Sequence, residues 1–355
     1  MIYTRLIIMS LFCLIGSKAT ATVPDGIWTM PEPTGLEFTT FTTDGERYIL
    51  YNPDTKLFFA SGNGWNSMAC LRTFGMEIWV QESAEEDAPE GSYELWDNNV
   101  NNPARSTGEL NMFTDDGNST WVDHGTQGNY SWGVEVKDGL VRFQNVALIA
   151  DKPEFEGMYL GFDGTFVIAD NPAGDANHRD AYTAILRHID PSTAGASVDF
   201  KAVTIDSYEA FVANEDAYNA YAQGAKIYFA SVELKKTIEN AEAIGFDVTD
   251  ALAVYTNKNS TLDDMECAIA SLKKTVEIDG IHYNLIFENK AAEVKSNPNK
   301  YTGNVVIPES VSFNGKNYSV KSIDYNAFSG CSGLTSITIP KSVITIGKGA
   351  FLLCI

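Results

Sequence analysis

The chain has 355 residues, and its 25 basic against 47 acidic side chains give a formal net charge of −22. A field of this sign repels phosphate backbones and anionic lipid surfaces, which argues against nucleic acid and membrane surfaces as partners. This length exceeds what one compact core usually holds, so two or three domains are expected.

The first residues are typical of an export signal. Arg5 precedes the mostly apolar run Leu6–Gly16, and the small residues Ala19–Ala21 favour cleavage after Ala21. The apolar run is too short to span a bilayer. A lipoprotein anchored through Cys13 is the alternative, although the residues before it make a poor lipobox. We therefore interpret residues 1–21 as a signal peptide and expect an exported protein, secreted or at the cell surface, without a transmembrane span in the mature chain.

The next part of the chain, from about Leu36 to Ile189, has the pattern of short strands. Three similar segments start 45 and 48 residues apart, at Tyr48–Asn52, Tyr93–Asp97 and Val141–Asn145. Each alternates apolar and mixed positions, ends on a polar turn residue and is followed by two further apolar runs. Because one such unit cannot bury its own apolar face, three units are expected to close on one another as a β-barrel.

This threefold pattern resembles a β-trefoil of the ricin-like lectin group and predicts such a domain over residues 22–200. The Gln-x-Trp signature of that group is absent, since Glu77-Ile78-Trp79 and Tyr130-Ser131-Trp132 stand in the matching places. The sugar-binding residues of the group are therefore not carried over. Aromatic and polar residues in glycine-containing turns are the candidate ligand contacts, against the alternative that the aromatic rings fill the core: Asn63, Trp65, Trp121, Tyr159 and Asp163.

A different periodicity begins after Asp190–Gly195, which has the composition of a linker. An early helix is predicted over Tyr208–Ala222, and two apolar stripes with helical spacing follow it. The first stripe is closed by Gly245, and the second begins at a capping box of Thr261 and Asp264. The stripes are formed by Ile227, Leu234, Ile238 and Ala241, and by Leu262, Met265, Ile269, Leu272 and Val276. Three short helices over residues 201–277 thus predict a small bundle, which resembles the FIVAR module, a spacer or docking element of extracellular proteins.

The C-terminal segment repeats itself. Ser322–Cys331 recurs as Thr345–Cys354 after 23 residues, with Ile, Ala, Phe and Cys returning at the same places. The run Val305–Pro308 returns as Ile337–Pro340 after 32 residues, and the nine extra residues fit a hairpin through Asn314-Gly315. A period of 23 with one apolar strand per turn predicts a solenoid of stacked coils.

These residues resemble the BspA-type leucine-rich repeat, over residues 278–355, with a strand-rich cap at Ile281–Gly303. The array stops inside its second full repeat, which we interpret as truncation of a longer protein. The resemblance implies surface display and adhesion. The expected fold is multidomain: an all-β barrel, a small α-helical bundle and a β-rich solenoid.

Reactive residues do not gather in any pattern that carries catalysis. The four histidines lack metal-ligand spacing, and no nucleophile motif accompanies the pair Asp123-His124. The cysteines remaining after cleavage are widely spread and are interpreted as mostly buried thiols: Cys70, Cys267, Cys331 and Cys354. We therefore predict no catalytic residue, no metal and no cofactor.

The expected function is adhesion through glycans or extracellular proteins, without catalysis. The alternative is a set of accessory binding modules of a secreted glycosidase or protease whose catalytic domain lies elsewhere in the protein. A structural role in the cell envelope is a third possibility.

Overall fold

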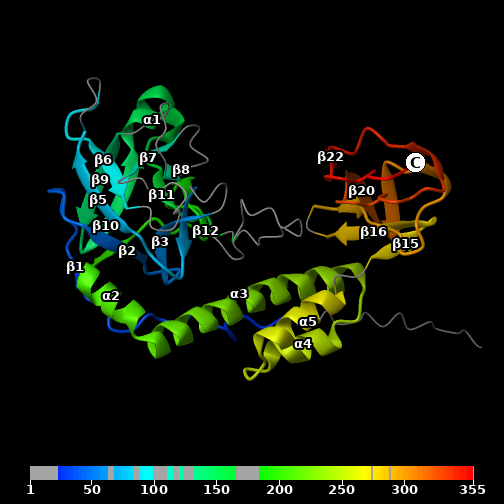
Figure 1. Cartoon of the computed structure of the whole chain (residues 1–355), viewed down its shortest axis with the longest axis horizontal. Helices are drawn as coiled ribbons and strands as arrows, with labels where there is room; N and C mark the ends of the chain where they lie inside the picture. Colours follow the sequence, from blue (N-terminus) through cyan, green and yellow to red (C-terminus); the bar gives the residue numbers. More distant parts are fainter. Residues whose placement is uncertain are drawn as a thin grey trace, which may run out of the picture. The chain divides into compact units, whose positions relative to one another are not determined.

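The structure is a computed structural model. It describes residues 23–62, 68–83, 88–98, 110–114, 120–122, 131–164, 166, 184–272, 275–287 and 289–354. The chain is multidomain and β-rich, with a few helices, and it divides into two compact units (Figure 1). We call Trp28–Phe229 the N-terminal unit, and Ala230–Ile355 with the segment up to Ile27 the C-terminal unit.

Short strands make up most of the N-terminal unit. Twelve of those in its described part form one sheet, and the two others, β11 and β13, pair with each other. In chain order the strands are β1 (Phe38–Thr39), β2 (Tyr48–Asn52), β3 (Leu57–Gly62), β4 (Met68–Arg72), β5 (Glu77–Glu82), β6 (Tyr93–Asp97), β7 (Leu110–Thr114), β8 (Thr120–Val122), β9 (Trp132–Lys137), β10 (Leu140–Asn145), β11 (Tyr159–Gly161), β12 (Ala184–Ile185), β13 (Arg187–Ile189) and β14 (Lys201–Val203). All three predicted first strands are therefore confirmed as β2, β6 and β10.

The strand pairing recurs three times. We call β2 to β5 the first strand group, β6 to β9 the second, and β10, β11, β13 and β14 the third. The first and fourth strands of a group pair, as β2 with β5 and β6 with β9, and Val141 of β10 bridges to Phe200 just before β14. The two middle strands pair as β3–β4, β7–β8 and β11–β13. Each fourth strand also pairs with the first strand of the next group, as β5–β6, β9–β10 and β14–β2. The last of these pairings returns to the start, so the sheet is curled.

The register recurs as well as the order. The first strands end on the buried polar residues Asn52, Asp97 and Asn145. The residue four positions before each of them faces a buried apolar partner on the fourth strand: Tyr48↔Ile78, Tyr93↔Trp132 and Val141↔Phe200. The residue two positions before each of them is buried and pairs with the fourth strand of the preceding group: Leu50↔Ala202, Leu95↔Val80 and Phe143↔Val134. Three equivalent layers of side chains thus meet in one core.

Helices differ from the sequence prediction in number and length. The structure has α1 (Val146–Asp151), η2 (Pro153–Phe155), α2 (Ile205–Ala213), α3 (Glu215–Ile244), α4 (Thr249–Thr256) and α5 (Leu262–Leu272). A single early helix over 208–222 is wrong, because Asn214 ends α2 and its side chain accepts a hydrogen bond from the Ala217 backbone at the start of α3. The capping box and the stop at Gly245 are confirmed, the latter by the φ of +94°.

Two further expectations need correction. The segment 190–195 is a turn between β13 and β14 inside the N-terminal unit, so it is not a linker between domains. Val276 lies in a strand and not at the end of the second helical stripe. The division into domains at 22–200, 201–277 and 278–355 stays a prediction. The boundary between the two compact units falls within α3, between Phe229 and Ala230.

The C-terminal strands follow the predicted repeat. They are β15 (Val276–Ile278), β16 (Ile281–Ile286), β17 (Ala291–Val294), β18 (Gly303–Val306), β19 (Ser310–Phe313), β20 (Lys316–Ile323), β21 (Leu334–Thr338) and β22 (Thr345–Ile346). Parallel pairing joins Val305 to Ile337 and Ser322 to Thr345, which are the spacings of 32 and 23 read from the sequence. The hairpin is confirmed too, since Asn314 and Gly315 have φ of 48° and 74°.

Candidate functional site

A pocket of about 490 Å³ lies in the N-terminal unit, between the turn that follows β2 and two segments of the third strand group. Phe162 directly follows β11, and Ser197 precedes β14. Six of the residues that line it are aromatic or polar and come from four parts of the chain: Asp54, Thr55, Phe162, Phe166, Ser197 and Tyr228. Such a mixture of aromatic surface with a few converging polar groups is typical of small-molecule sites.

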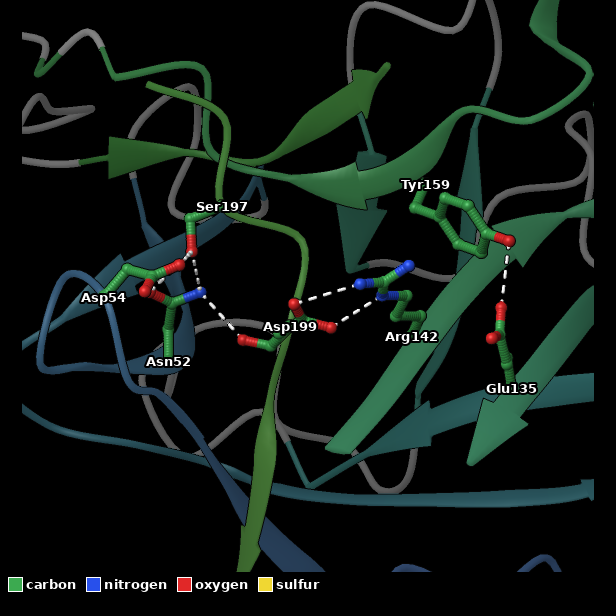
Figure 2. Close-up of polar contacts among 7 residues, drawn as sticks. All are labelled: Asn52, Asp54, Glu135, Arg142, Tyr159, Ser197 and Asp199. Atoms are coloured by element: carbon green, nitrogen blue, oxygen red, sulfur yellow. Dashed lines mark hydrogen bonds and ion pairs between the residues drawn. The ribbon is translucent and has the colours of Figure 1, made fainter. Parts of the chain in front are cut away.

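Asn52 holds the polar side of this pocket in place. Its fully buried side chain donates hydrogen bonds to Ser197 Oγ (2.9 Å) and to the carbonyl oxygen of Asp199 (3.0 Å). Its amide oxygen accepts from the backbone N–H and the hydroxyl of Thr55 (2.9 and 2.8 Å). Ser197 Oγ lies 2.6 Å from Asp54 Oδ2, and Figure 2 shows the side chains of Asn52, Asp54 and Ser197 turned toward one another. These hydrogen bonds therefore join the first strand group to the third.

Two glycines line the same pocket. Gly164 and Gly195 have φ of +86° and +83°, a region that side chains with a Cβ rarely adopt. A Cβ on Gly164 would lie 3.3 Å from the carbonyl oxygen of Gly195. The absence of a Cβ on Gly164 therefore favours this close approach of the two backbones.

A second, smaller hollow of about 180 Å³ lies beside β9 and β10. Its walls contain a bidentate ion pair, in which Arg142 donates to both oxygens of Asp199 (2.6 and 3.1 Å), and this pair raises the pKa of Arg142. Nearby, the Tyr159 hydroxyl donates to Glu135 Oε2 (2.9 Å), which raises the pKa of Tyr159 (Figure 2). These charged groups largely satisfy one another, which makes this hollow the weaker candidate for a ligand.

The predicted ligand contacts fall in different places. Asn63 and Trp65 lie outside the described residues. Trp121 is in β8, where it pairs with Met68, and its side chain lies outside the described part. Tyr159 contacts Glu135 and stands near Arg142, whereas Asp163 lies between two lining residues of the larger pocket. Whether any of these five residues binds a ligand stays a prediction.

The main pocket residues were missed by sequence reasoning. Asp54 and Ser197 are 143 positions apart, and no local pattern joins them. The available signal was Asn52, which ends the first of the three similar segments and which the sequence marks only as a polar turn residue.

Among the described residues, no three His, Cys, Asp or Glu side chains form a group that could hold a metal ion. Cys70 and Cys331 are buried and Cys354 is partly buried, as predicted, but Cys267 is exposed on α5. Cys267 is the exception because it lies outside the apolar stripe of its helix, whose buried residues are Met265, Ala268, Ile269 and Leu272. No described helix is both long and apolar enough to cross a membrane.

Part of the C-terminal unit matches a known protein family. Residues 307–355 match the BspA type leucine rich repeat region. This is the repeat that the residues of the C-terminal segment resemble. Proteins that carry it are generally adhesion-type proteins of the cell surface.

Solved structures give short matches. A leucine rich cell surface protein from Faecalibacterium prausnitzii A2-165 is 26% identical over 23% of this chain and 21% of its own, with a TM-score of 0.21. A leucine-rich repeat protein from Bacteroides ovatus ATCC 8483 is 36% identical over 22% of this chain and 21% of its own, with a TM-score of 0.20. A complex of lysenin with phosphocholine is 13% identical over 46% of each chain, with a TM-score of 0.29. The match thus spans about a fifth of either repeat protein, and no curated protein matches this chain.

Proposed function

We propose that this protein is an exported, non-catalytic adhesion protein of the cell surface whose N-terminal unit binds a glycan. The observation that carries the proposal is the 490 Å³ pocket, whose lining combines aromatic side chains with a carboxylate and the hydroxyls of Thr55 and Ser197. Aromatic faces attract the polarised C–H bonds of a sugar ring, and carboxylate and hydroxyl oxygens suit its hydroxyl groups. In the same proposal, residues 1–21 direct export of the chain and are then removed by cleavage after Ala21.

The N-terminal unit is, in this proposal, a β-trefoil. Three strand groups with one pairing order and one register support it, because that fold is built from three such groups around a common core. The helices after it act as a FIVAR-like spacer, which the buried stripe of α5 supports. The leucine-rich repeats then offer a second surface, for extracellular proteins.

The pocket can be closed without removing any hydrogen-bonding group. Ala196 lines it, whereas Ala194 lies in the same loop and is exposed. We expect Ala196→Phe to abolish binding of the full chain on a glycan array, and Ala194→Phe to bind as wild type does. Binding that survives Ala196→Phe would contradict the pocket assignment. Silence of the wild-type chain across a broad panel of glycans would overturn the glycan-binding function itself.

A further inference from the structure

The pocket carries a negative charge without a matching cation. The Asp54 carboxylate accepts a hydrogen bond from Ser197, and no described Lys, Arg or His pairs with it. Lys56, two residues further on, directs its ammonium group to Glu32 (2.8 Å) and to the Met30 carbonyl oxygen (3.1 Å). The described residues that line the pocket include no basic side chain.

Aromatic rings lie around the same space. Phe162 and Phe166 pack 4.7 Å apart at an interplanar angle of 47°, and Tyr228 contributes a further ring from α3. Phe162 is buried, whereas Phe166 and Tyr228 keep part of their surface exposed. An aromatic face attracts a cation through its quadrupole, and the attraction grows as the site loses water.

A ligand group with a positive charge would therefore gain from both features. The carboxylate offers a charge-assisted hydrogen bond, which is stronger than the bond a neutral hydroxyl would receive. The net charge of −22 adds a long-range field of the same sign.

We propose that this pocket selects a glycan bearing a free amino group, such as a hexosamine without its N-acetyl group. The inference rests on the proposed glycan-binding function and adds the class of sugar. The ammonium group lies against Asp54, and the sugar ring lies against the partly exposed aromatic surface of Phe166 and Tyr228.

Three disaccharides test the inference because they share one backbone. The β-1,4-linked dimers of glucosamine, N-acetylglucosamine and glucose differ only at the C2 substituent, and their affinities for the full chain can be measured by calorimetry at low salt. We expect the glucosamine dimer to bind at least about tenfold more tightly than the glucose dimer, with a preference that shrinks as salt is added. Equal affinity for all three, or tightest binding of the acetylated dimer, would overturn the inference and leave glycan binding standing. Failure of all three dimers, and of every glycan on the array, would overturn both.

Two matched variants test whether the charge of Asp54 causes the preference for the glucosamine dimer. Asp54→Asn keeps an oxygen that accepts from Ser197 but removes the charge, so the preference for the glucosamine dimer should fall to within about twofold. Asp138→Asn makes the same charge change in the β9–β10 turn, away from this pocket, and Asn tolerates the φ of 53° found there. It should bind as wild type does. An equal loss in both variants would attribute the preference to the overall field, and an unchanged preference in Asp54→Asn would remove the carboxylate from the proposal.

Discussion

Replacing Asn52 by Ala removes the amide that joins the first and third strand groups. The side chain is fully buried and takes part in hydrogen bonds with Thr55, Ser197 and the Asp199 carbonyl. Alanine removes the hydrogen bonds to Thr55 and to the Asp199 carbonyl, leaves Ser197 with its bond to Asp54, and opens a small cavity. Asn145→Ala, at the equivalent position of the third group, removes the bond that caps α1 at the Leu148 N–H (2.8 Å).

The magnitude follows from counting the groups left without a partner. Each buried group that loses its hydrogen bond costs about 1–3 kcal/mol. Thr55 is partly exposed and can turn to water, and Ser197 keeps its bond to Asp54, so the Asp199 carbonyl and the cavity dominate. We therefore expect Asn52→Ala to lower the free energy of unfolding by about 2–4 kcal/mol. Asn145→Ala, which removes at least the cap of α1, should lower it by at least about 1 kcal/mol.

Tryptophan fluorescence during urea unfolding is a suitable assay, because the N-terminal unit contains all six tryptophans: Trp28, Trp65, Trp79, Trp96, Trp121 and Trp132. The transition midpoint and slope then report that unit alone. A loss below about 1 kcal/mol in Asn52→Ala would refute the idea that this amide closes the third group onto the first.

Three other perturbations probe the rest of the fold. Phe328 is fully buried and its ring stacks on that of Phe351 at 5.3 Å. Phe328→Ala should therefore lower the free energy of unfolding of the repeats by about 3–5 kcal/mol. Hydrogen exchange in the repeats should show this loss, while the tryptophan transition stays unchanged. Gly347→Ala should also loosen the repeats in the same experiment, because a Cβ there would overlap the backbone of Tyr325; unchanged protection would contradict this. Burial raises the pKa of Tyr208 from 10.0 to about 12, so its contribution to stability is present below pH 10 and is lost as the pH rises to 12. Alkaline unfolding followed by fluorescence should show this loss, and Tyr208→Phe should reduce its pH dependence.

The sequence predicted those features that depend on neighbours along the chain. Alternation located β2, β6 and β10, and identical side chains returning after 23 residues located the parallel pairing of Ser322 with Thr345. The break at Asn214 had a local signal as well. Asn followed by Glu215 and Asp216 is a cap with an acidic first turn, but the apolar spacing on both sides hid it.

The binding pocket could not be predicted in this way. Asp54 and Ser197 meet because β14 returns to pair with β2, and that pairing closes the curled sheet. A residue in a polar turn has the same sequence signature whether it faces solvent or a pocket. Tyr159 illustrates this, since the sequence shows its glycine-rich surroundings but not that its hydroxyl donates to Glu135.

The three strand groups also separate what the fold requires from what binding requires. Asn52 and Asn145 use the same contact, a side-chain oxygen that accepts from the backbone N–H three residues later. After Asn145, however, the chain forms α1 and buries Leu148, whereas the corresponding residue after Asn52 is Thr55, which lines the pocket beside Asp54. The buried amide is therefore part of the repeated architecture, and the polar turn belongs to one group. It follows that Asp54→Asn should keep the wild-type urea midpoint while changing ligand preference, and that Asn52→Ala should lower the midpoint. A fall in the midpoint of Asp54→Asn as large as that of Asn52→Ala would show that the two roles cannot be separated.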